Sequence, residues 1–146
     1  MCIKRLFPII AVLFAAVFFA CSDDSDKESP VSFDQLPEQA QSFVKLFFSD
    51  SAVQSVETSG SGWNVNFTNG TEIDFNSEGS WTSIDCGLGV TVPYDLVPVN
   101  IHTFVEQNYP SAGVVEISRT TSEYEIELSN GIDATFDLHG NFLHFD

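Results

Sequence analysis

Two groups of side chains in the sequence have types and spacings that could bind a metal ion. Asp74, Asn76, Glu78 and Asp85, with Gly79, occupy positions 1, 3, 5, 12 and 6 of a calcium-loop pattern. His139, His144 and Asp146 form a second possible ligand group. Both groups lie in segments that also predict β-hairpins, where the glycine would serve a turn. The hairpin is the favoured interpretation, and we expect neither a metal ion nor another cofactor.

Catalytic chemistry has no comparable pattern in this chain. There is no glycine-rich phosphate loop, no nucleophile elbow and no histidine pair at zinc-binding spacing. Carboxylates are so abundant that a pair of them carries no weight as an acid–base site. The thiol of Cys86 lies beside Asp85, which would raise its pKa, so we expect a small, partly buried residue. The chain is therefore not expected to be an enzyme.

Polar and aromatic side chains that alternate with apolar ones predict a third kind of site, a binding surface. Trp63, Val65 and Phe67 are expected to face a core, which turns their neighbours to the opposite side of a strand. The predicted surface residues are Asn64, Asn66, Asp74, Trp81, Glu125, Glu127, Asp133, Phe142 and His144. Aromatic groups among acids are typical of a surface that binds a basic or polar partner. In the alternative interpretation, Trp81 and Phe142 pack inside the protein and the acids are merely solvated.

These residues are predicted to lie on two copies of one structural unit. Residues 36–85 align with residues 97–146 without a gap, with ten identical positions. Each copy predicts one helix after Pro37 or Pro98 and then a four-stranded antiparallel meander. The first set of strands is expected at 53–57, 62–67, 72–75 and 81–84, and the second set at 114–118, 123–128, 133–136 and 142–145. Residues 86–96 would link the two copies and could add a short strand at 90–92.

The turns decide which side chains share a face. A two-residue Asn69-Gly70 turn would pair Phe67 with Glu72, so we expect three-residue loops with a bulge at both Asn-Gly sites. At the following turn, a two-residue Glu78-Gly79 loop would direct Ile84 inward and Trp81 outward. The same geometry would direct Phe145 inward, and Phe142 and His144 outward. A bulged turn at this point would reverse these orientations.

The N-terminal residues predict a lipoprotein signal peptide over 1–20. Lys4 and Arg5 precede an apolar stretch that ends at Ala20 and is too short to span a membrane. The run that ends at Cys21 resembles a lipobox, whose cysteine is lipidated, although an ordinary cleaved signal could also happen to precede a cysteine. Residues 21–35 are predicted to be the lipid anchor and an acidic, flexible tether. We expect a cell-envelope protein anchored to the outer membrane, and the acidic cluster after Cys21 resembles a surface-export signal.

The charge of the chain excludes two classes of partner. The sequence has 21 acidic residues and only 5 Lys+Arg, and residues 21–146 carry a formal charge of −18. Nucleic acids are bound largely through Lys and Arg, and anionic membrane surfaces also attract basic residues, so neither suits this chain. We expect a monomer that contacts the membrane only through the lipid on Cys21.

Several short patterns together resemble the PepSY-like family. They are the Leu36-Pro37 helix start, Tyr109-Pro110 at a helix end, the alternation of residues 124–128, Asn130-Gly131, and Phe136-Asp137-x-x-Gly140. The resemblance covers about residues 36–146 and implies an α+β fold, in which one curved sheet has helices on one face and an open opposite face. The family is similar to beta-lactamase-inhibitor proteins, which bind a protein on such a face, and it occurs in secreted and lipid-anchored bacterial proteins.

The resemblance and the surface residues together predict a non-catalytic binding protein. Its acidic open face would bind a partner protein, and inhibition is one form that this binding could take. The alternative is a surface lipoprotein that binds a carbohydrate or another small ligand, with Trp81 and Phe142 stacking on a sugar ring.

Overall fold

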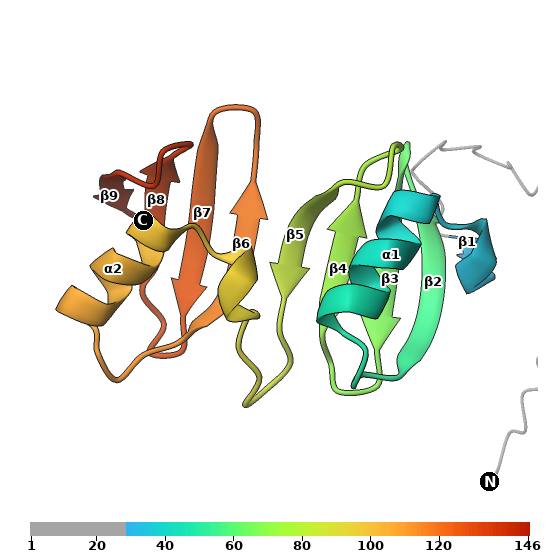
Figure 1. The fold of residues 1–146 in the computed structure, drawn as a ribbon, viewed down its shortest axis with the longest axis horizontal. Helices are drawn as coiled ribbons and strands as arrows, with labels where there is room; N and C mark the ends of the chain where they lie inside the picture. The colour runs from blue at the N-terminus through green and yellow to red at the C-terminus, as the bar shows by residue number, and fades with distance from the viewer. Residues whose placement is uncertain (1–28) are drawn as a thin grey trace, which may run out of the picture.

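The computed structural model describes residues 29–146, so the predicted signal peptide and Cys21 lie outside the described residues. The strands form one antiparallel sheet in which β1 to β9 follow each other in sequence order (Figure 1). Their bounds are β1 (Ser29–Val31), β2 (Val53–Ser59), β3 (Gly62–Phe67), β4 (Glu72–Phe75), β5 (Trp81–Asp85), β6 (Val114–Arg119), β7 (Glu123–Leu128), β8 (Asp133–Asp137) and β9 (Phe142–Phe145). Two helices, α1 (Glu38–Phe47) and α2 (Val99–Asn108), lie on one face of the sheet.

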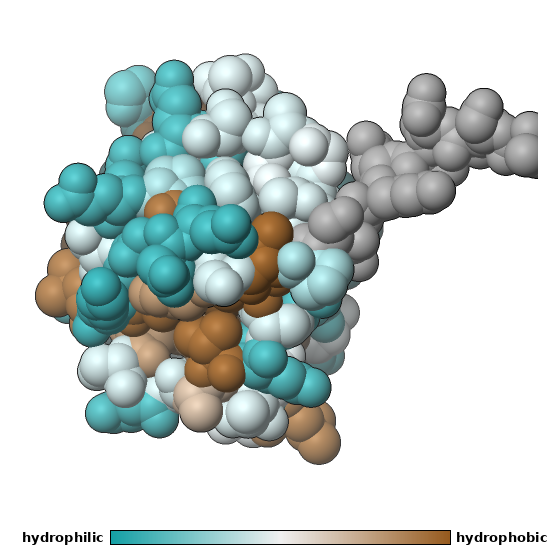
Figure 2. Space-filling model, turned by 90° about the vertical axis from the view of Figure 1, so that its right-hand side faces the viewer, coloured by the Kyte–Doolittle hydropathy of each residue, from teal (hydrophilic) through white to brown (hydrophobic). Residues whose placement is uncertain are grey.

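The described residues also contain two short 3-10 helices. The short helices are η1 (Phe33–Gln35) and η2 (Tyr94–Leu96). Seen from the β1 end, the surface carries hydrophobic residues interspersed with hydrophilic ones (Figure 2). Within residues 29–146, neither helix has the length and apolar character needed to cross a membrane.

The order of one helix and then four strands occurs twice, and we call residues 36–85 the first unit and residues 97–146 the second unit. The strand register is the same at aligned positions of the two units: Val65 pairs with Ile73 in the first unit, and Ile126 pairs with Ala134 in the second. Strands β5 and β6 join the two units into one sheet through pairs that include Ser83 with Ser118.

Each helix is held to the sheet by one apolar stripe. Ala40 and Val44 are buried on α1, and Ile101 and Val105 are buried on α2, at the four-residue spacing that puts side chains on one helical face. Both helices have only ten residues, which is marginal for an isolated helix, so packing on the sheet must stabilise them.

An aromatic pair connects helix and sheet in the same way in both units. Phe43 of α1 meets Phe75 edge-on at 5.7 Å and 84°, and Phe104 of α2 meets Phe136 at 5.2 Å and 82°. Edge-to-face pairs of this kind stabilise by roughly 0.5–1.5 kcal/mol beyond the area that they bury. The core therefore lies between the helices and the sheet, and the other face of the sheet is left without a helix among the described residues.

The predicted three-residue loops are confirmed at both Asn-Gly sites. In the first, the amide of Gly70 donates to the carbonyl of Phe67, and the amide of Phe67 donates to the carbonyl of Thr71. Gly70 has a φ of +84°, the left-handed conformation that a bulged loop requires. Leu128, Gly131 and Ile132 repeat these bonds in the second unit.

The turn between β4 and β5 also has a three-residue loop, so the predicted two-residue loop at Glu78-Gly79 is wrong. The amide of Asn76 donates to the carbonyl of Ser80, and the amide of Gly79 donates back to Asn76. The Asn76 side chain accepts the amides of Glu78 and Ser80, which stabilises this longer loop. A loop of this length pairs Phe75 with Trp81 and directs the indole toward the helices.

A β-bulge then keeps the next apolar residue in the core as well. The register shifts between Asp74, which pairs with Ser83, and Phe75, which pairs with Trp81, so that Thr82 is the extra residue. Ile84 consequently faces inward opposite Ile73, as predicted.

The same shift occurs in the second unit, at Leu143. Phe136 pairs with Phe142, and Thr135 pairs with His144. The inward orientation of Phe145 is confirmed, whereas the outward orientation predicted for Trp81 and Phe142 is wrong. In each unit the three-residue turn directs the first aromatic residue of the strand inward. The bulge after it then directs the residue three positions later to the same face.

The sheet also begins earlier than the sequence predicted. Strand β1 pairs with β2, with Pro30 opposite Glu57, and η1 follows it, so the last part of the segment 21–35 assigned to the tether belongs to the folded domain. Residues 90–92 do not form a strand, although the amide of Val92 donates to the carbonyl of Val114.

Candidate functional site

The face of the sheet opposite the helices carries a line of carboxylates that crosses both units. Directly paired residues of antiparallel strands lie on the same face with Cβ atoms about 4.5–5.5 Å apart, so the register defines the line. We call it the acidic row: Glu72, Asp85, Glu116, Glu127 and Asp133. Five acids in adjacent positions make a strongly negative strip that favours a cationic partner.

A second line of polar residues runs beside the acidic row. Its members are Asn64, Asp74, Ser83, Ser118, Glu125, Thr135 and His144. All the predicted surface residues except Trp81 and Phe142 therefore lie on the open face. Most of them belong to these two lines, and Asn66 lies opposite Glu72 at the start of the acidic row.

Glu116 lies in the acidic row at the junction of the two units, and its pKa is shifted upward. Burial raises its pKa above the usual value for glutamate, and nearby negative charges raise it further. These charges belong to Asp85, Glu127, Asp133 and Glu125. A shallow pocket of about 250 Å³ opens beside Glu116 between Ser118, Glu127 and Asp133. The protein thus holds like charges together at the junction of its two units.

In the first unit, side-chain amides compensate part of this negative charge. Asn64 is 5% exposed and donates to the carboxylates of Glu72 and Asp74, the latter at 2.9 Å. Asn66 donates to the side-chain oxygen of Asn64 at 2.7 Å and to the Ser55 hydroxyl. Both asparagines therefore position neighbouring polar groups, and the second unit has Glu125 and Glu127 at the equivalent places.

His144 and Asp146 contact each other at the end of the sheet. The Nδ1 atom of His144 lies 3.2 Å from the Oδ1 atom of Asp146, and the Oδ2 atom of the same carboxylate accepts a hydrogen bond from the Thr135 hydroxyl at 2.9 Å. His139 lies instead in the turn before β9, where its amide donates to Asp137. Among residues 29–146, no group of three or more acidic, His or Cys side chains is arranged to hold a metal ion.

The calcium-loop pattern is likewise not assembled. Asp74 lies in β4, and Asp85 lies at the end of β5 in the acidic row. Asn76 and Glu78 belong to the turn, where the Asn76 side-chain oxygen is already used by two backbone amides. The hairpin therefore accounts for these residues.

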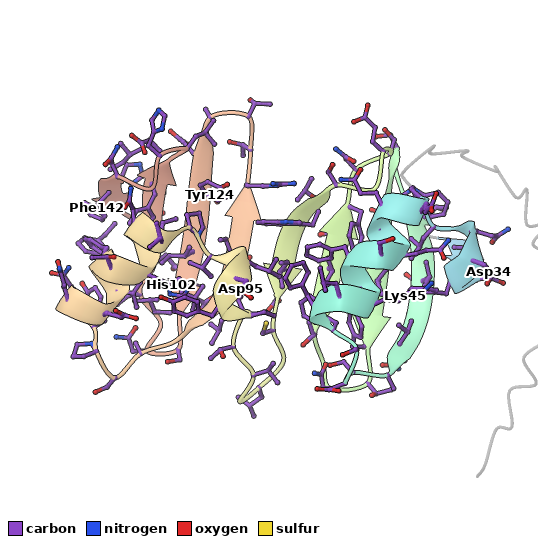
Figure 3. All side chains as sticks on the ribbon, in the orientation of Figure 1. Asp34, Lys45, Asp95, His102, Tyr124 and Phe142 are labelled. Carbon is purple, nitrogen blue, oxygen red and sulfur yellow. The ribbon has the colours of Figure 1, made fainter. Side chains whose placement is uncertain are left out.

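Trp81 and Phe142 lie on the helix side of the sheet and do not contribute to the open face. Trp81 is 9% exposed. The guanidinium carbon of Arg119 lies 4.2 Å from the centre of the Trp81 ring, and the Arg119 Nε donates a hydrogen bond to the Trp81 carbonyl. Phe142 stacks on Phe104 at 4.8 Å and remains 37% exposed (Figure 3). Their predicted role in the surface is corrected accordingly.

A cleft of about 490 Å³ opens on this helix side where the two units meet. Its walls come from β5, β6 and β7 through Trp81, Arg119 and Tyr124, and from η2 and α2 (Figure 3). Tyr94 and His102 stack at 3.7 Å on the far wall, and the His102 Nε2 lies 2.8 Å from the Tyr94 carbonyl oxygen. The cleft combines aromatic surface with one guanidinium and the carboxylate of Asp95.

Cys86 is buried and does not have the environment of a reactive thiol. Burial raises its pKa to about 11, with a further contribution from Asp85 and an opposing one from a hydrogen bond with Thr71. A thiol with this pKa is almost entirely protonated near neutral pH, and the thiolate is the nucleophilic form. The sequence predicted a small, partly buried residue, and the structure buries Cys86 more fully than that.

The sequence interpretation missed Glu116 and the cleft residues. The position of Glu116 before Ile117 was a usable signal, because an inward Ile117 turns Glu116 outward. The cleft had no such signal, since Trp81 and Arg119 on its wall come together only when β5 pairs with β6.

Comparison with known proteins identifies the family. Residues 61–144 match the profile described as "Putative beta-lactamase-inhibitor-like, PepSY-like", and the chain belongs to this family. A search of functionally curated proteins finds no significant match.

Three solved structures from Bacteroides share the fold. The first, from Bacteroides thetaiotaomicron, is described as "a putative calcium-regulated periplasmic protein"; it is 36% identical, with a TM-score of 0.78, over 82% of this chain and 96% of that one. The second, "a putative periplasmic protein" from Bacteroides vulgatus, is 35% identical, with a TM-score of 0.77, over 86% and 98%. The third, from the same species and described as of unknown function, is 28% identical, with a TM-score of 0.77, over 82% and 99%. Their descriptions agree with a cell-envelope protein.

Proposed function

We propose that this chain is a non-catalytic, lipid-anchored envelope protein whose acidic open face binds a basic partner protein. The acidic row carries this proposal, because its carboxylates lie together on a face that no described helix covers. Burial and, after it, repulsion by neighbouring carboxylates raise the pKa of Glu116, and a cationic side chain of the partner would relieve the repulsion. Inhibition of an enzyme partner is the form of binding suggested by the family description.

Two finer features of the fold belong to the same proposal. We infer that the two units are copies of one unit, because their registers, turns and edge-to-face phenylalanine pairs correspond at aligned positions. We also infer that the sheet is curved, since the bulges at Thr82 and Leu143 are devices that bend strands.

Anchoring through Cys21 is proposed from the sequence alone, since this residue lies outside the described residues. Mass spectrometry of the N-terminal peptide of the processed protein tests it directly. A diacylglyceryl-modified Cys21 as the first residue is expected, and an unmodified peptide that begins there would contradict the anchor.

Affinity capture with the processed protein, from the envelope and growth medium of its own organism, tests the binding proposal. The bait is compared with a double variant, Glu125→Lys with Glu127→Lys, that reverses charge at the centre of the open face. Because one relative is described as calcium-regulated, the capture is done both with calcium and with a chelator.

A control variant separates a local effect from a change in total charge. Glu38→Lys with Glu106→Lys makes the same change in net charge on exposed positions of α1 and α2. The captured partner should be lost with the open-face variant, retained with the helix variant and released by salt. Equal capture by both variants would refute the open-face site.

A second candidate function is the binding of a small ligand, for instance a carbohydrate, in the helix-side cleft. The cleft favours it because Tyr94 is 62% exposed and lies beside Arg119, Asp95 and Tyr124, groups that can stack on a ring or form hydrogen bonds. Tyr94→Ala should abolish such binding without disturbing the acidic row, and binding that persists in this variant would exclude the cleft.

A further inference from the structure

Within residues 29–146, no strand covers the outer edge of β9, whereas β6 covers the equivalent edge in the first unit. Strand β5 pairs with β4 on one side and with β6 on the other. Strand β9 occupies the corresponding place in the second unit and pairs only with β8 within residues 29–146. A strand edge without a neighbour presents a row of backbone donors and acceptors to another chain.

The side chains of β9 are also exposed, as expected for a strand without a neighbour on one side. Phe145 is 50% exposed, whereas Ile84, its equivalent in the first unit, is fully buried. Leu143 at the bulge is 45% exposed, and the Phe142 ring remains 37% exposed although it stacks on Phe104. Phe142, Phe145 and Tyr109 form one aromatic cluster, with ring centres 4.6 Å apart for the two phenylalanines and 6.3 Å apart for Phe145 and Tyr109.

The first unit shows what kind of segment covers such an edge. Strand β6 runs antiparallel to β5 and places Ile117 opposite Ile84. Two residues later, Arg119 lies over the Trp81 ring at 4.2 Å and donates its Nε hydrogen to the Trp81 carbonyl. An apolar residue and a cation two residues later therefore cover Ile84 and Trp81, whose equivalents in β9 are Phe145 and Phe142.

We propose that β9 binds an extended segment of a partner protein as a tenth, antiparallel strand of the sheet. The segment places an apolar side chain opposite Phe145 and an Arg or Lys side chain two residues later over the ring of Phe142. Backbone hydrogen bonds supply the binding and the alternate side chains supply its specificity, as in other cases of strand addition. The backbone pairing at this edge does not depend on the open-face site proposed above, although the charges near the edge include Asp133 and Glu127 of the acidic row.

The charge around β9 selects a basic segment. By the register of β5 with β6, the partner residue before the apolar one lies opposite Asp146, and the next strand positions on that face are Asp133 and Glu127. A cation at this position gains an ion pair, whereas the glutamate that β6 itself has there, Glu116, would be repelled. A second copy of this chain is an unsuitable occupant because two chains of such acidity repel each other.

Peptides based on β6 test the proposal with a defined probe. One peptide has the sequence of residues 114–121, VVEISRTT, and a second has Glu116→Lys in that sequence. Each is titrated into the isotope-labelled processed protein, and amide chemical shifts and hydrogen exchange are followed. Shifts and slowed exchange are expected at 142–146, and the lysine peptide should bind up to about fivefold more tightly than the glutamate peptide, the range of an exposed ion pair.

Two changes test the cation that is expected over Phe142. Arg119→Ala in the lysine peptide and Phe142→Ala in the protein should each weaken binding by about two- to fivefold. The peptide change cannot unfold the protein, so it remains informative if the protein variant is destabilised. Leu46→Ala, which removes an exposed apolar side chain of α1, is the matched control and should have no effect.

Three results would overturn the proposal. They are equal affinity for the lysine and glutamate peptides, shifts confined to the acidic row, and shifts in β9 that depend on protein concentration without peptide. The second result would leave the open-face proposal intact, and the third would make a second copy the occupant.

Discussion

Trp81 and Phe142 occupy equivalent places in the two units but have different surroundings. Each follows a three-residue turn, pairs with a buried phenylalanine and precedes a bulge. Trp81 is nevertheless covered by Arg119 from the next strand, whereas Phe142 has no further strand beside it among the described residues. Equivalent local structure therefore gives a core residue in one unit and an exposed residue in the other, and the neighbouring strand makes the difference.

The largest expected contrast concerns the residues at the centre of these strands. Ile84→Ala should lower the free energy of unfolding by about 2–5 kcal/mol, because it leaves a cavity between β4, β6 and the helix layer. Phe145→Ala should cost only about 1 kcal/mol, because half of that side chain is already exposed. Denaturant unfolding of both variants measures the difference, and equal losses would show that β9 is covered in solution.

Substitution of the turn glycines should have the next largest effect on the free energy of unfolding. An alanine Cβ at Gly79 would lie 2.8 Å from the Pro37 Cβ, and at Gly140 it would lie 2.9 Å from the Asn100 Cβ, in addition to a positive φ at both. Gly79→Ala and Gly140→Ala should each cost about 2–4 kcal/mol, from strained backbone plus crowding at the helix start.

Gly131→Ala is the matched control for those two variants. Gly131 has a φ of +78° but no atom within 4 Å of the added Cβ, so its substitution should cost about 1–2 kcal/mol from the backbone alone. Thermal unfolding compares the three proteins. A cost at Gly131 as large as at Gly79 would mean that contact with the helix contributes nothing.

Substitution of Arg119 should lower the stability of the protein moderately. The second unit has no equivalent contact, because no described strand lies beside Phe142. Arg119→Met removes the charge over Trp81 and the bond to its carbonyl, and should cost about 1–2 kcal/mol. Lys45→Met is the control, because the amine of the exposed Lys45 lies 5.7 Å from the centre of the Phe33 ring and should contribute almost nothing. Unfolding followed by tryptophan fluorescence tests the pair, and similar losses would argue against the Arg119 contact.

The smallest expected effect is stabilising and depends on pH. The folded protein raises the pKa of Glu116, so the charged form destabilises the fold as pH rises through that pKa. Glu116→Gln should therefore add about 0.2–1 kcal/mol at neutral pH, the range for like charges on paired strands.

This gain should disappear at acidic pH, where Glu116 is protonated in both the folded and the unfolded state. Stability measured from pH 3 to pH 8 checks the sign, with Glu106→Gln on the exposed face of α2 as control. A gain that is independent of pH would show that repulsion in the acidic row is not its cause.

Within residues 29–146, the apolar pattern of the sequence was enough to predict both helices, eight of the nine strands and the loops at both Asn-Gly sites. These follow from periods of 3.6 and 2 in apolar residues, and from the need to keep Phe67 and Ile73 on one face. Most open-face residues followed from the same alternation, because each strand of the meander has one apolar side.

The positions of Trp81 and Phe142, the acidic row as a continuous line and the cleft at Tyr94 depend on tertiary contacts that the sequence pattern did not reveal. The bulges at Thr82 and Leu143 have no local sequence signal. The first allows Trp81 and Ile84 both to be buried, and the second directs Phe142 and Phe145 to the same face of the sheet. The row and the cleft need the pairing of β5 with β6, which brings together residues that are far apart in the chain. Alternation within a strand specifies a face, but contacts between strands decide what lies beside it.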